Sequence, residues 1–193
     1  MKSSLRWLLL LLALVTAAPL YLIYRFAGLL IGAERVFPGF SQLLSLFPGL
    51  SGQLLRRGFY FMALKNSSSL FTIDFGTFFP SPNVVLGKYV YIGAHCIIAP
   101  CVIGDDVIIG SGVHLVSGKE THHFDSPDKP IRLQGGVWQL IRIGVNSWIG
   151  NNAIVMADVG DHCVIGAGSV VTKPVDDWSI AVGNPARVIR KRQ

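Results

Sequence analysis

The chain has 193 residues, of which 51% are hydrophobic and only 15% are charged, a composition that excludes a disordered or collagen-like protein. The formal net charge of +6 lies entirely within residues 1–70, which hold seven basic side chains and one acidic side chain. Residues 71–193 are neutral overall. Because the basic part is also strongly apolar, its charge favours a membrane surface rather than nucleic acid as the partner.

The chain begins with an apolar segment. Residues 7–24 contain no charged side chain and would extend roughly 27 Å as a helix, enough to cross the core of a bilayer. Lys2 and Arg6 in front of this segment, with small residues behind it, also resemble a cleavable secretory signal. The apolar character continues to about Ala33, past any such cleavage site. We therefore favour a retained α-helical membrane anchor.

The next section contains two Pro-Gly turn signals, at residues 37–41 (FPGFS) and 47–51 (FPGLS). The pieces between turns are too short to cross a bilayer, and apolar residues mixed with Arg56 and Arg57 suit a segment that lies among lipid headgroups. The same residues could instead pack against the downstream domain or another subunit, and the sequence leaves both alternatives open. The polar stretch 65–69 (KNSSS) predicts a loop after this section.

From residue 71 onward the sequence follows a period of six. An aliphatic residue, usually followed by glycine, recurs every six positions, with a small or β-branched residue four positions later. A helix repeats near 3.6 residues and a half-buried strand repeats every two, so neither explains this period. A triangular coil does, because each hexapeptide can form one flat face with its aliphatic side chain inward. The aliphatic positions are Leu86, Ile92, Ile103, Ile109, Ile143, Ile149 and Ile165.

The period predicts an all-β fold, a left-handed parallel β-helix of hexapeptide repeats with about five coils. Its hand is an exception to the usual right-handed crossover. We expect two units: residues 1–70, a membrane-anchoring segment that meets the membrane through residues 1–64, and residues 71–193, the β-helix. The shortened steps from Ile98 to Ile103 and from Val155 to Val159 predict tightened corners.

The three cysteines are predicted to be reduced and buried. Cys96 and Cys163 occupy the small-residue position of the repeat, and Cys101 lies in a shortened step. Three cysteines cannot all pair internally, and the chain has no CxxC spacing typical of a metal site. Free buried thiols favour a cytoplasmic location for the β-helix, and we expect no metal site.

The repeat stops between Leu115 and Ile143, where residues 117–142 form a polar stretch with two adjacent histidines, His122 and His123. A long interruption in so regular a pattern is usually functional or disordered. Apolar residues within it favour an ordered loop, because they give the loop something to pack. These residues are Phe124, Ile131, Trp138 and Leu140.

Motifs in this loop and after it resemble those of the hexapeptide-repeat O-acetyltransferases, in particular the polysaccharide, galactoside and nodulation-factor group. Thr121 replaces the family's asparagine before the histidine, and one extra residue precedes it, so His122 and His123 remain alternatives for the family's base. The matching runs are 117–118 (SG), 121–125 (THHFD), Pro127, 130–131 (PI), 134–135 (QG), 148–150 (WIG), 166–173 (GAGSVVTK) and 183–190 (GNPARVIR).

The resemblance, which covers residues 71–193, implies an acyltransferase that moves an acetyl group from acetyl-CoA to a sugar hydroxyl. Such a reaction needs a base, since a hydroxyl is a poor nucleophile at neutral pH and an imidazole can accept its proton. The resemblance assigns this role to His122 and places His123 and His95 on the substrate side. The two remaining histidines, His114 and His162, are expected to have surface or structural roles.

The resemblance also implies the positions that hold acetyl-CoA. Lys191 and Arg192 match no family position, and we expect them to form a solvated basic tail. The implied cofactor-binding residues are Trp148, Gly150, Asn151, Ala167, Thr172, Lys173, Arg187 and Arg190.

The family resemblance further implies a homotrimer with active sites between neighbouring prisms. Together with the anchor, it predicts a membrane-associated enzyme whose catalytic domain is cytoplasmic and whose acceptor is a polysaccharide or a lipid-linked glycan precursor. Two alternatives remain: an acetyltransferase for a small amine, serine or antibiotic, and a non-catalytic trimeric β-helix scaffold.

Overall fold

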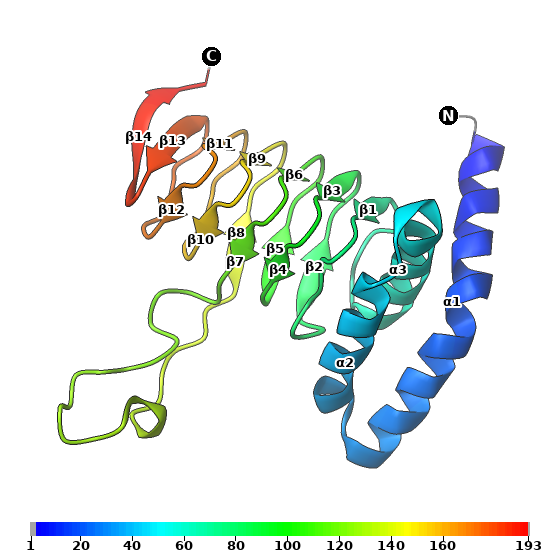
Figure 1. The fold of residues 1–193 in the computed structure, drawn as a ribbon. Helices are drawn as coiled ribbons and strands as arrows, with labels where there is room; N and C mark the ends of the chain where they lie inside the picture. The colour runs from blue at the N-terminus through cyan, green and yellow to red at the C-terminus, as the bar shows by residue number, and fades with distance from the viewer. Residues whose placement is uncertain (1–2, 193) are drawn as a thin grey trace.

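The structure, a computed structural model, describes residues 3–192 (Figure 1). Three helices cover one end of a prism built from short parallel strands. The helices are α1 (Ser3–Ile31), α2 (Ala33–Ser45) and α3 (Gly49–Ala63). A long arm leaves the prism between β7 and β8, and an antiparallel hairpin closes the far end.

Helix α1 confirms the expected apolar N-terminal helix. Among the described residues it is the one helix long and apolar enough to cross a membrane, over Arg6–Ile31. Gly32 follows it with φ of 94° and begins the turn into α2. A backbone in this left-handed region favours glycine, which has no Cβ to clash.

One of the two predicted Pro-Gly turns is wrong. Pro38 and Gly39 lie inside α2, which continues to Ser45 because Phe37 and Leu44 are fully buried and hold the segment helical. Tertiary packing thus overrides the local signal of the proline. The second signal is correct, since Pro48 caps α3 and Gly49 has a positive φ.

Helices α2 and α3 pack against the prism, which confirms the second of the two alternatives for this section, while Leu43 and Leu50 remain exposed. The Ser41 hydroxyl and the Tyr60 hydroxyl are 2.7 Å apart, and the backbone N–H of Phe79 donates to the same serine oxygen at 2.7 Å. The rings of Tyr60 and Phe79 are 4.6 Å apart. One continuous hydrophobic core therefore runs from the helices into the first coils.

The burial of Arg56 contradicts the expectation that this residue lies among lipid headgroups. The residue has no exposed surface, and its guanidinium donates to the carbonyl oxygens of Ile73, Leu44 and Phe47 at 2.8 to 2.9 Å. Burial lowers its pKa. The neighbouring Arg57 donates to the Ser69 carbonyl at 2.6 Å. Both arginines therefore join α3 to the protein itself.

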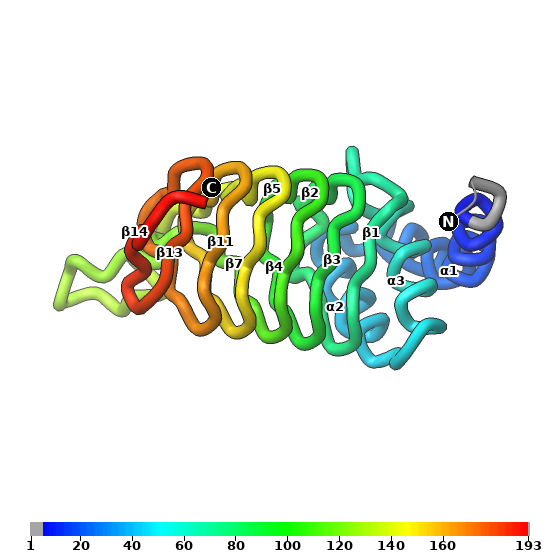
Figure 2. The backbone as a smooth tube through the Cα atoms, turned by 90° about the horizontal axis from the view of Figure 1, so that it is seen from above, coloured from blue at the N-terminus to red at the C-terminus, as the bar shows by residue number. Residues whose placement is uncertain are grey.

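The prism has three parallel sheets, one on each side. Sheet A has the order β1-β3-β6-β9-β11-β13 with β14 added antiparallel, sheet B the order β12-β10-β7-β4, and sheet C the order β2-β5-β8. Figure 2 shows the coils stacked along the axis. The strands are β1 Phe71–Ile73, β2 Val84–Leu86, β3 Val90–Ile92, β4 Ile97–Ile98, β5 Cys101–Ile103, β6 Ile108–Ile109, β7 His114–Leu115, β8 Ile141–Ile143, β9 Trp148–Ile149, β10 Ile154–Val155, β11 Val164–Ile165, β12 Val170–Val171, β13 Ser179–Gly183 and β14 Ala186–Lys191.

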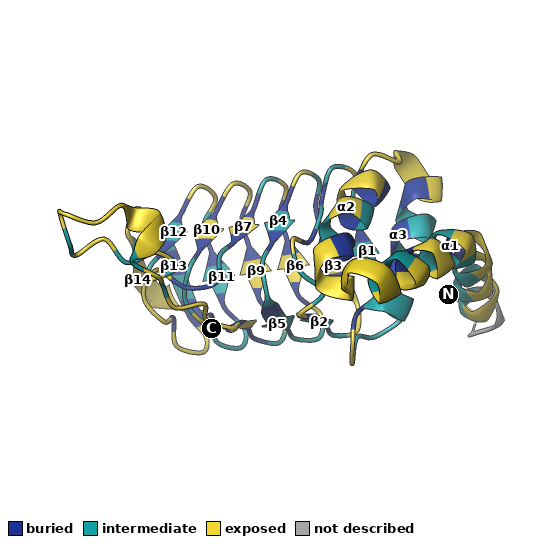
Figure 3. Ribbon diagram, turned by 90° about the horizontal axis from the view of Figure 1, so that it is seen from below, coloured by how far each residue is buried: buried dark blue, intermediate teal, exposed yellow. Residues whose placement is uncertain are grey.

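The repeat residues fill the interior, as predicted. The aliphatic positions are at most 1% exposed, and Cys96, Cys101 and Cys163 are fully buried with free thiols. Figure 3 shows buried positions alternating with exposed ones along the strands. Burial raises the pKa of each thiol, which makes these cysteines inert packing groups.

The two shortened steps lie at one edge of the prism. Every connection from sheet B to sheet C crosses this edge, which we call the arm edge, and all but one of these connections are short. Val159 pairs with Ile143 and Val175 in single bridges there. The connections are residues 99–100, 116–140, 156–158 and 172–174.

Candidate active site

The long interruption folds into an ordered arm. It runs over residues 116–140, two residues shorter at its end than expected, because β8 already begins at Ile141. Its two legs are joined by backbone bonds from Val137 to the Glu120 carbonyl at 2.7 Å and from His123 to the Gly135 carbonyl at 3.0 Å. Backbone hydrogen bonds therefore order the arm, which projects from the prism (Figure 1). The expected packing of its apolar residues is wrong, because Phe124, Ile131, Trp138 and Leu140 are each more than half exposed.

Gln134 holds the tip of the arm together. Its side-chain oxygen accepts from the Ser126 N–H at 3.0 Å, and its amide nitrogen donates to the carbonyls of Ser126 and Lys129 at 2.9 and 2.7 Å. A short 3₁₀ helix, η1 (Ile131–Leu133), directly precedes it. This explains in physical terms why the family motif has a glutamine at this position.

The two histidines of the arm differ in exposure. His122 is exposed, and its ring lies 6.3 Å from that of Trp138 at an interplanar angle of 78°. His123 is half-buried and is held by its backbone N–H. Among residues 3–192 neither imidazole has a side-chain hydrogen bond, so no carboxylate of the same chain, Asp125 included, orients the base.

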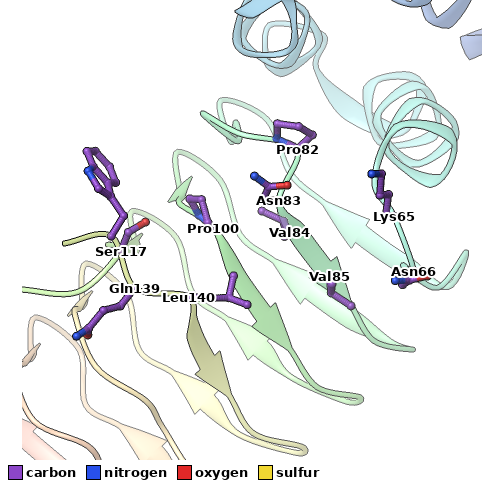
Figure 4. A pocket seen from close by; sticks show the side chains of 11 residues that line it. Lys65, Asn66, Pro82, Asn83, Val84, Val85, Pro100, Ser117, Gln139 and Leu140 are labelled. Atoms are coloured by element: carbon purple, nitrogen blue, oxygen red, sulfur yellow. The ribbon is translucent and has the colours of Figure 1, made fainter. Parts of the chain in front are cut away.

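The foot of the arm separates two clefts. The first, of about 500 Å³, lies over sheet C and includes Trp138 and Ser117 in its wall (Figure 4). The second, of about 540 Å³, includes Lys119, Thr172 and Lys173. Gln139 and Leu140 line both clefts. The arm edge thus brings the histidine loop next to two of the predicted cofactor residues.

Ser117 has an unusual environment at this foot. The residue is 1% exposed, and its hydroxyl has no hydrogen-bond partner among the described residues. A buried unpaired hydroxyl is costly, and this one belongs to the wall of the first cleft (Figure 4). A polar ligand in that cleft would be a suitable partner.

The remaining cofactor candidates lie elsewhere on the prism. Gly150, Asn151 and Ala167 are at the edge between sheets A and B, which we call the glycine edge, and Arg187 pairs with Val182 beside it. Trp148 is half exposed on sheet A, where Arg190 lies opposite Ile180. One prism therefore divides the predicted cofactor residues between two edges and sheet A.

Small residues and backbone groups are crowded at the glycine edge. A Cβ on Gly150 would meet the Ala167 nitrogen at 2.5 Å, so successive corners are in close contact. The Asn151 side chain accepts from the Ser111 N–H at 3.0 Å. Its oxygen is therefore used in the prism, which leaves its amide N–H groups for a ligand.

The basic residues near the C-terminus differ in their hydrogen-bond partners. Lys173, Arg187 and Arg190 are exposed, and none is paired with a carboxylate among the described residues. Lys191 donates to the Asp177 carbonyl at 2.7 Å and the Ser179 hydroxyl at 3.1 Å.

Arg192 similarly donates to the Asn146 carbonyl at 3.1 Å. The expectation that Lys191 and Arg192 form a solvated tail is therefore wrong. Both side chains fasten the closing hairpin to the preceding coils. The side chains of Arg187 and Arg190 donate only to carbonyls of adjacent residues, and that of Lys173 has no hydrogen-bond partner among the described residues.

The structure separates the other histidines from the arm. His95 is exposed at the glycine edge with φ of 58°, its ring against Phe75 at 5.5 Å. His162 stacks on Trp178 with ring centroids 4.1 Å apart, which confirms a structural role. His114 is exposed on β7. Among the described residues no group of three His, Cys, Asp or Glu side chains could hold a metal ion.

Comparisons with known proteins match the two repeat sections on either side of the arm. The profile "Bacterial transferase hexapeptide (six repeats)" matches residues 83–117, and "Hexapeptide repeat of succinyl-transferase" matches residues 140–173. Galactoside O-acetyltransferase of Escherichia coli is 37% identical over 116 residues, which cover 56% of this chain and 54% of the relative. Chloramphenicol acetyltransferase of Agrobacterium fabrum is 35% identical over 144 residues, which cover 58% of this chain and 69% of the relative.

A solved galactoside acetyltransferase in complex with coenzyme A superposes with a TM-score of 0.62 at 24% identity, covering 83% of this chain and 81% of that one. The superposition gives the fold, the left-handed β-helix. The chain spans between about a third and a half of the length of the first curated relatives that it matches. The repeat, the loop motifs and these relatives lead to one assignment: the chain belongs to the hexapeptide-repeat O-acetyltransferase family.

Proposed function

We propose that the protein transfers an acetyl group from acetyl-CoA to a hydroxyl of a sugar. The proposal rests on the arrangement at the arm edge. The foot of the loop that bears His122 lies between two clefts, and Lys173 lines one of them. The reaction needs a base near the acceptor and a cation near the donor. His122 lines neither cleft, but its ring is 6.3 Å from that of Trp138, which lines the first. The named relatives are acetyltransferases, and the solved galactoside acetyltransferase is in complex with coenzyme A.

In the proposed reaction His122 accepts the proton of the sugar hydroxyl as its oxygen attacks the thioester carbon. The new C–O bond forms, the C–S bond breaks, and the imidazolium returns the proton to the coenzyme A thiolate. Backbone N–H groups at a prism edge would stabilise the charge on the tetrahedral oxygen. Because neither ring nitrogen of His122 has a hydrogen-bond partner within residues 3–192, the substrate or a second subunit would orient the ring.

We further propose a homotrimer. The cofactor residues divide between the arm edge, the glycine edge and sheet A, and the arm projects from its own prism (Figure 1). A neighbouring prism placed beside the arm would bring one subunit's histidine to the other subunit's glycine edge. A closed ring of three subunits would repeat that contact without leaving an open end. His95, at the glycine edge, would then reach the substrate side.

For the acceptor we propose a glycan precursor linked to a lipid. The first cleft shares Lys65, Pro82 and Asn83 with another of about 550 Å³, which α1 and α3 line with Arg25 and Met62. The two clefts therefore adjoin at these three residues, between the foot of the arm and the helices. An enzyme held at the membrane by α1 would also meet a lipid-linked sugar at high local concentration. Acetyl-CoA and the free thiols favour the cytoplasmic side.

A coenzyme A release assay with an acceptor panel tests the proposal. We expect turnover with a galactoside or maltose, and none with serine or a primary amine. One specific observation supports a second candidate, since one of the relatives is a chloramphenicol acetyltransferase, so chloramphenicol belongs in the panel. Turnover with chloramphenicol alone would replace the sugar proposal, and no turnover with any acceptor would favour a scaffold. Mass spectrometry of surface glycans, with active enzyme and with His122→Ala, then identifies the natural product.

A further inference from the structure

Helix α1 is joined closely to the rest of the protein along one face. A Cβ on Gly58 of α3 would overlap the Ala13 carbonyl and meet the Ala17 Cβ at 2.9 Å. Ala13 and Ala17 are fully buried. Further along, the ring of Tyr24 packs edge-on against Phe59 at 5.5 Å. Because the two backbones approach so closely, α1 is part of the folded cap and is not a free tether.

The opposite face of α1 is apolar and uncovered within the described residues. Its side chains are more than half exposed over most of the helix, and no acidic residue occurs before Glu34. Two cations near the end of α1, Arg25 and Arg35, are exposed. A broad apolar face bordered by positive charge fits an anionic phospholipid surface. The exposed apolar residues are Trp7, Leu8, Leu11, Leu12, Val15, Leu22, Ile23, Phe26, Leu29, Leu30 and Ile31.

Helix α1 lies beside the prism at two places. At one end, the Arg6 guanidinium donates to the Tyr89 hydroxyl at 3.2 Å and lies 5.8 Å from the centre of that ring. In its second half, Arg25 of α1 lines one cleft together with Asn83 of the prism. Figure 2 shows α1 nearly end-on while the prism axis runs across the view. The helix therefore lies across the end of the prism.

We propose that α1 lies in the plane of the membrane, embedded in one leaflet by its exposed apolar face, and does not cross the bilayer. The prism axis then stands upright on the membrane, and both ends of α1 face the same compartment as the prism. A crossing helix would carry Tyr89 and the first polar coils into hydrocarbon, where unpaired polar groups are costly. The inference rests on the membrane association proposed above and not on acetyl transfer.

Vesicle sedimentation of the full chain tests the contact. The triple variant Leu11→Gln, Phe26→Gln, Leu30→Gln should lower binding to vesicles of phosphatidylglycerol and phosphatidylcholine at least tenfold, with little change in melting temperature because these residues are more than half exposed. The matched control is Ile108→Gln, an exposed apolar residue of β6. Unchanged vesicle binding would overturn the proposal, as would a triple variant that changes the oligomeric state instead, since the face would then bind a second copy.

Thiol labelling decides the orientation. The three native cysteines are buried, so single cysteines at Ser4, Glu34 and Lys129 can be probed in intact cells and in inverted membrane vesicles with an impermeant maleimide. An in-plane helix predicts that all three positions react from the same side. Opposite labelling of Ser4→Cys and Lys129→Cys would show a crossing helix and reject the inference. Acetylation of a soluble galactoside in detergent, measured in parallel, reports on the proposed activity independently of either result.

Discussion

The imidazole of His122 lies edge-on to the indole of Trp138, with ring centroids 6.3 Å apart. The two residues belong to opposite legs of the arm, which backbone bonds on either side of them hold together. Trp138 also lines the cleft over sheet C. This contact keeps the candidate base close to the wall of the cleft, although the arm extends away from the prism core.

We therefore expect His122→Ala to lower kcat by roughly 10²- to 10⁴-fold, the usual contribution of a general base. His123→Ala should have a smaller effect, since the backbone of His123 supplies its contact with Gly135. Steady-state kinetics with a galactoside acceptor compares the two variants. If His123→Ala proves the more damaging, the roles of the two residues must be exchanged.

The arm makes a second prediction at Gly136. A Cβ there would overlap the Thr121 carbonyl and meet the His122 nitrogen at 3.0 Å, so Gly136→Ala must push the two legs apart. We expect kcat/KM to fall by at least tenfold while the melting temperature changes little, because the arm lies outside the prism core. Lys129→Ala is the matched control, as only its backbone carbonyl is used. A large drop in melting temperature would instead show that the arm stabilises the fold.

The basic residues predict a change in donor affinity. Lys173→Ala and Arg187→Ala should each raise the KM for acetyl-CoA about tenfold, the effect of losing a charge-assisted contact of about 1.4 kcal/mol, with the KM for the acceptor unchanged. Lys191→Ala is the control, because its ammonium is bonded to Asp177 and Ser179. It should lower the melting temperature and leave both KM values unaltered. An unchanged KM for acetyl-CoA in the first two variants would remove them from the donor site.

The prism could be predicted from the sequence because the six-residue period follows directly from the local structure of each coil. Each aliphatic residue, such as Ile92 or Ile149, must face inward in every coil, so the pattern identifies the fold without long-range information. The motifs at the arm and at Lys173 identified candidate residues that the structure brings to one edge. The edges on which the other cofactor residues lie could not be predicted, because they depend on how the coils stack in the structure.

The helical cap could not be predicted in the same way. Arg56 has the sequence environment of a surface residue beside a membrane, and nothing local indicates the three carbonyl oxygens, including that of Ile73, that it reaches. Pro38 signals a turn, yet burial of Phe37 keeps α2 intact. Both errors arise because distant contacts, made only after folding, outweigh the local preference.

Arg56 gives the last prediction, which concerns stability. Arg56→Met keeps much of the side-chain volume but removes the side-chain donor of the carbonyls of Ile73, Leu44 and Phe47, of which that of Leu44 retains a backbone bond at 3.4 Å and that of Phe47 is part-buried. Each buried carbonyl left unpaired costs about 1 to 3 kcal/mol, partly offset because the charge no longer has to be buried. We expect a net loss on the order of 3 kcal/mol in urea unfolding. Arg57→Met, which removes one bond to Ser69, should cost only about 1 kcal/mol. Equal losses in the two variants would mean that the cap does not depend on the buried guanidinium.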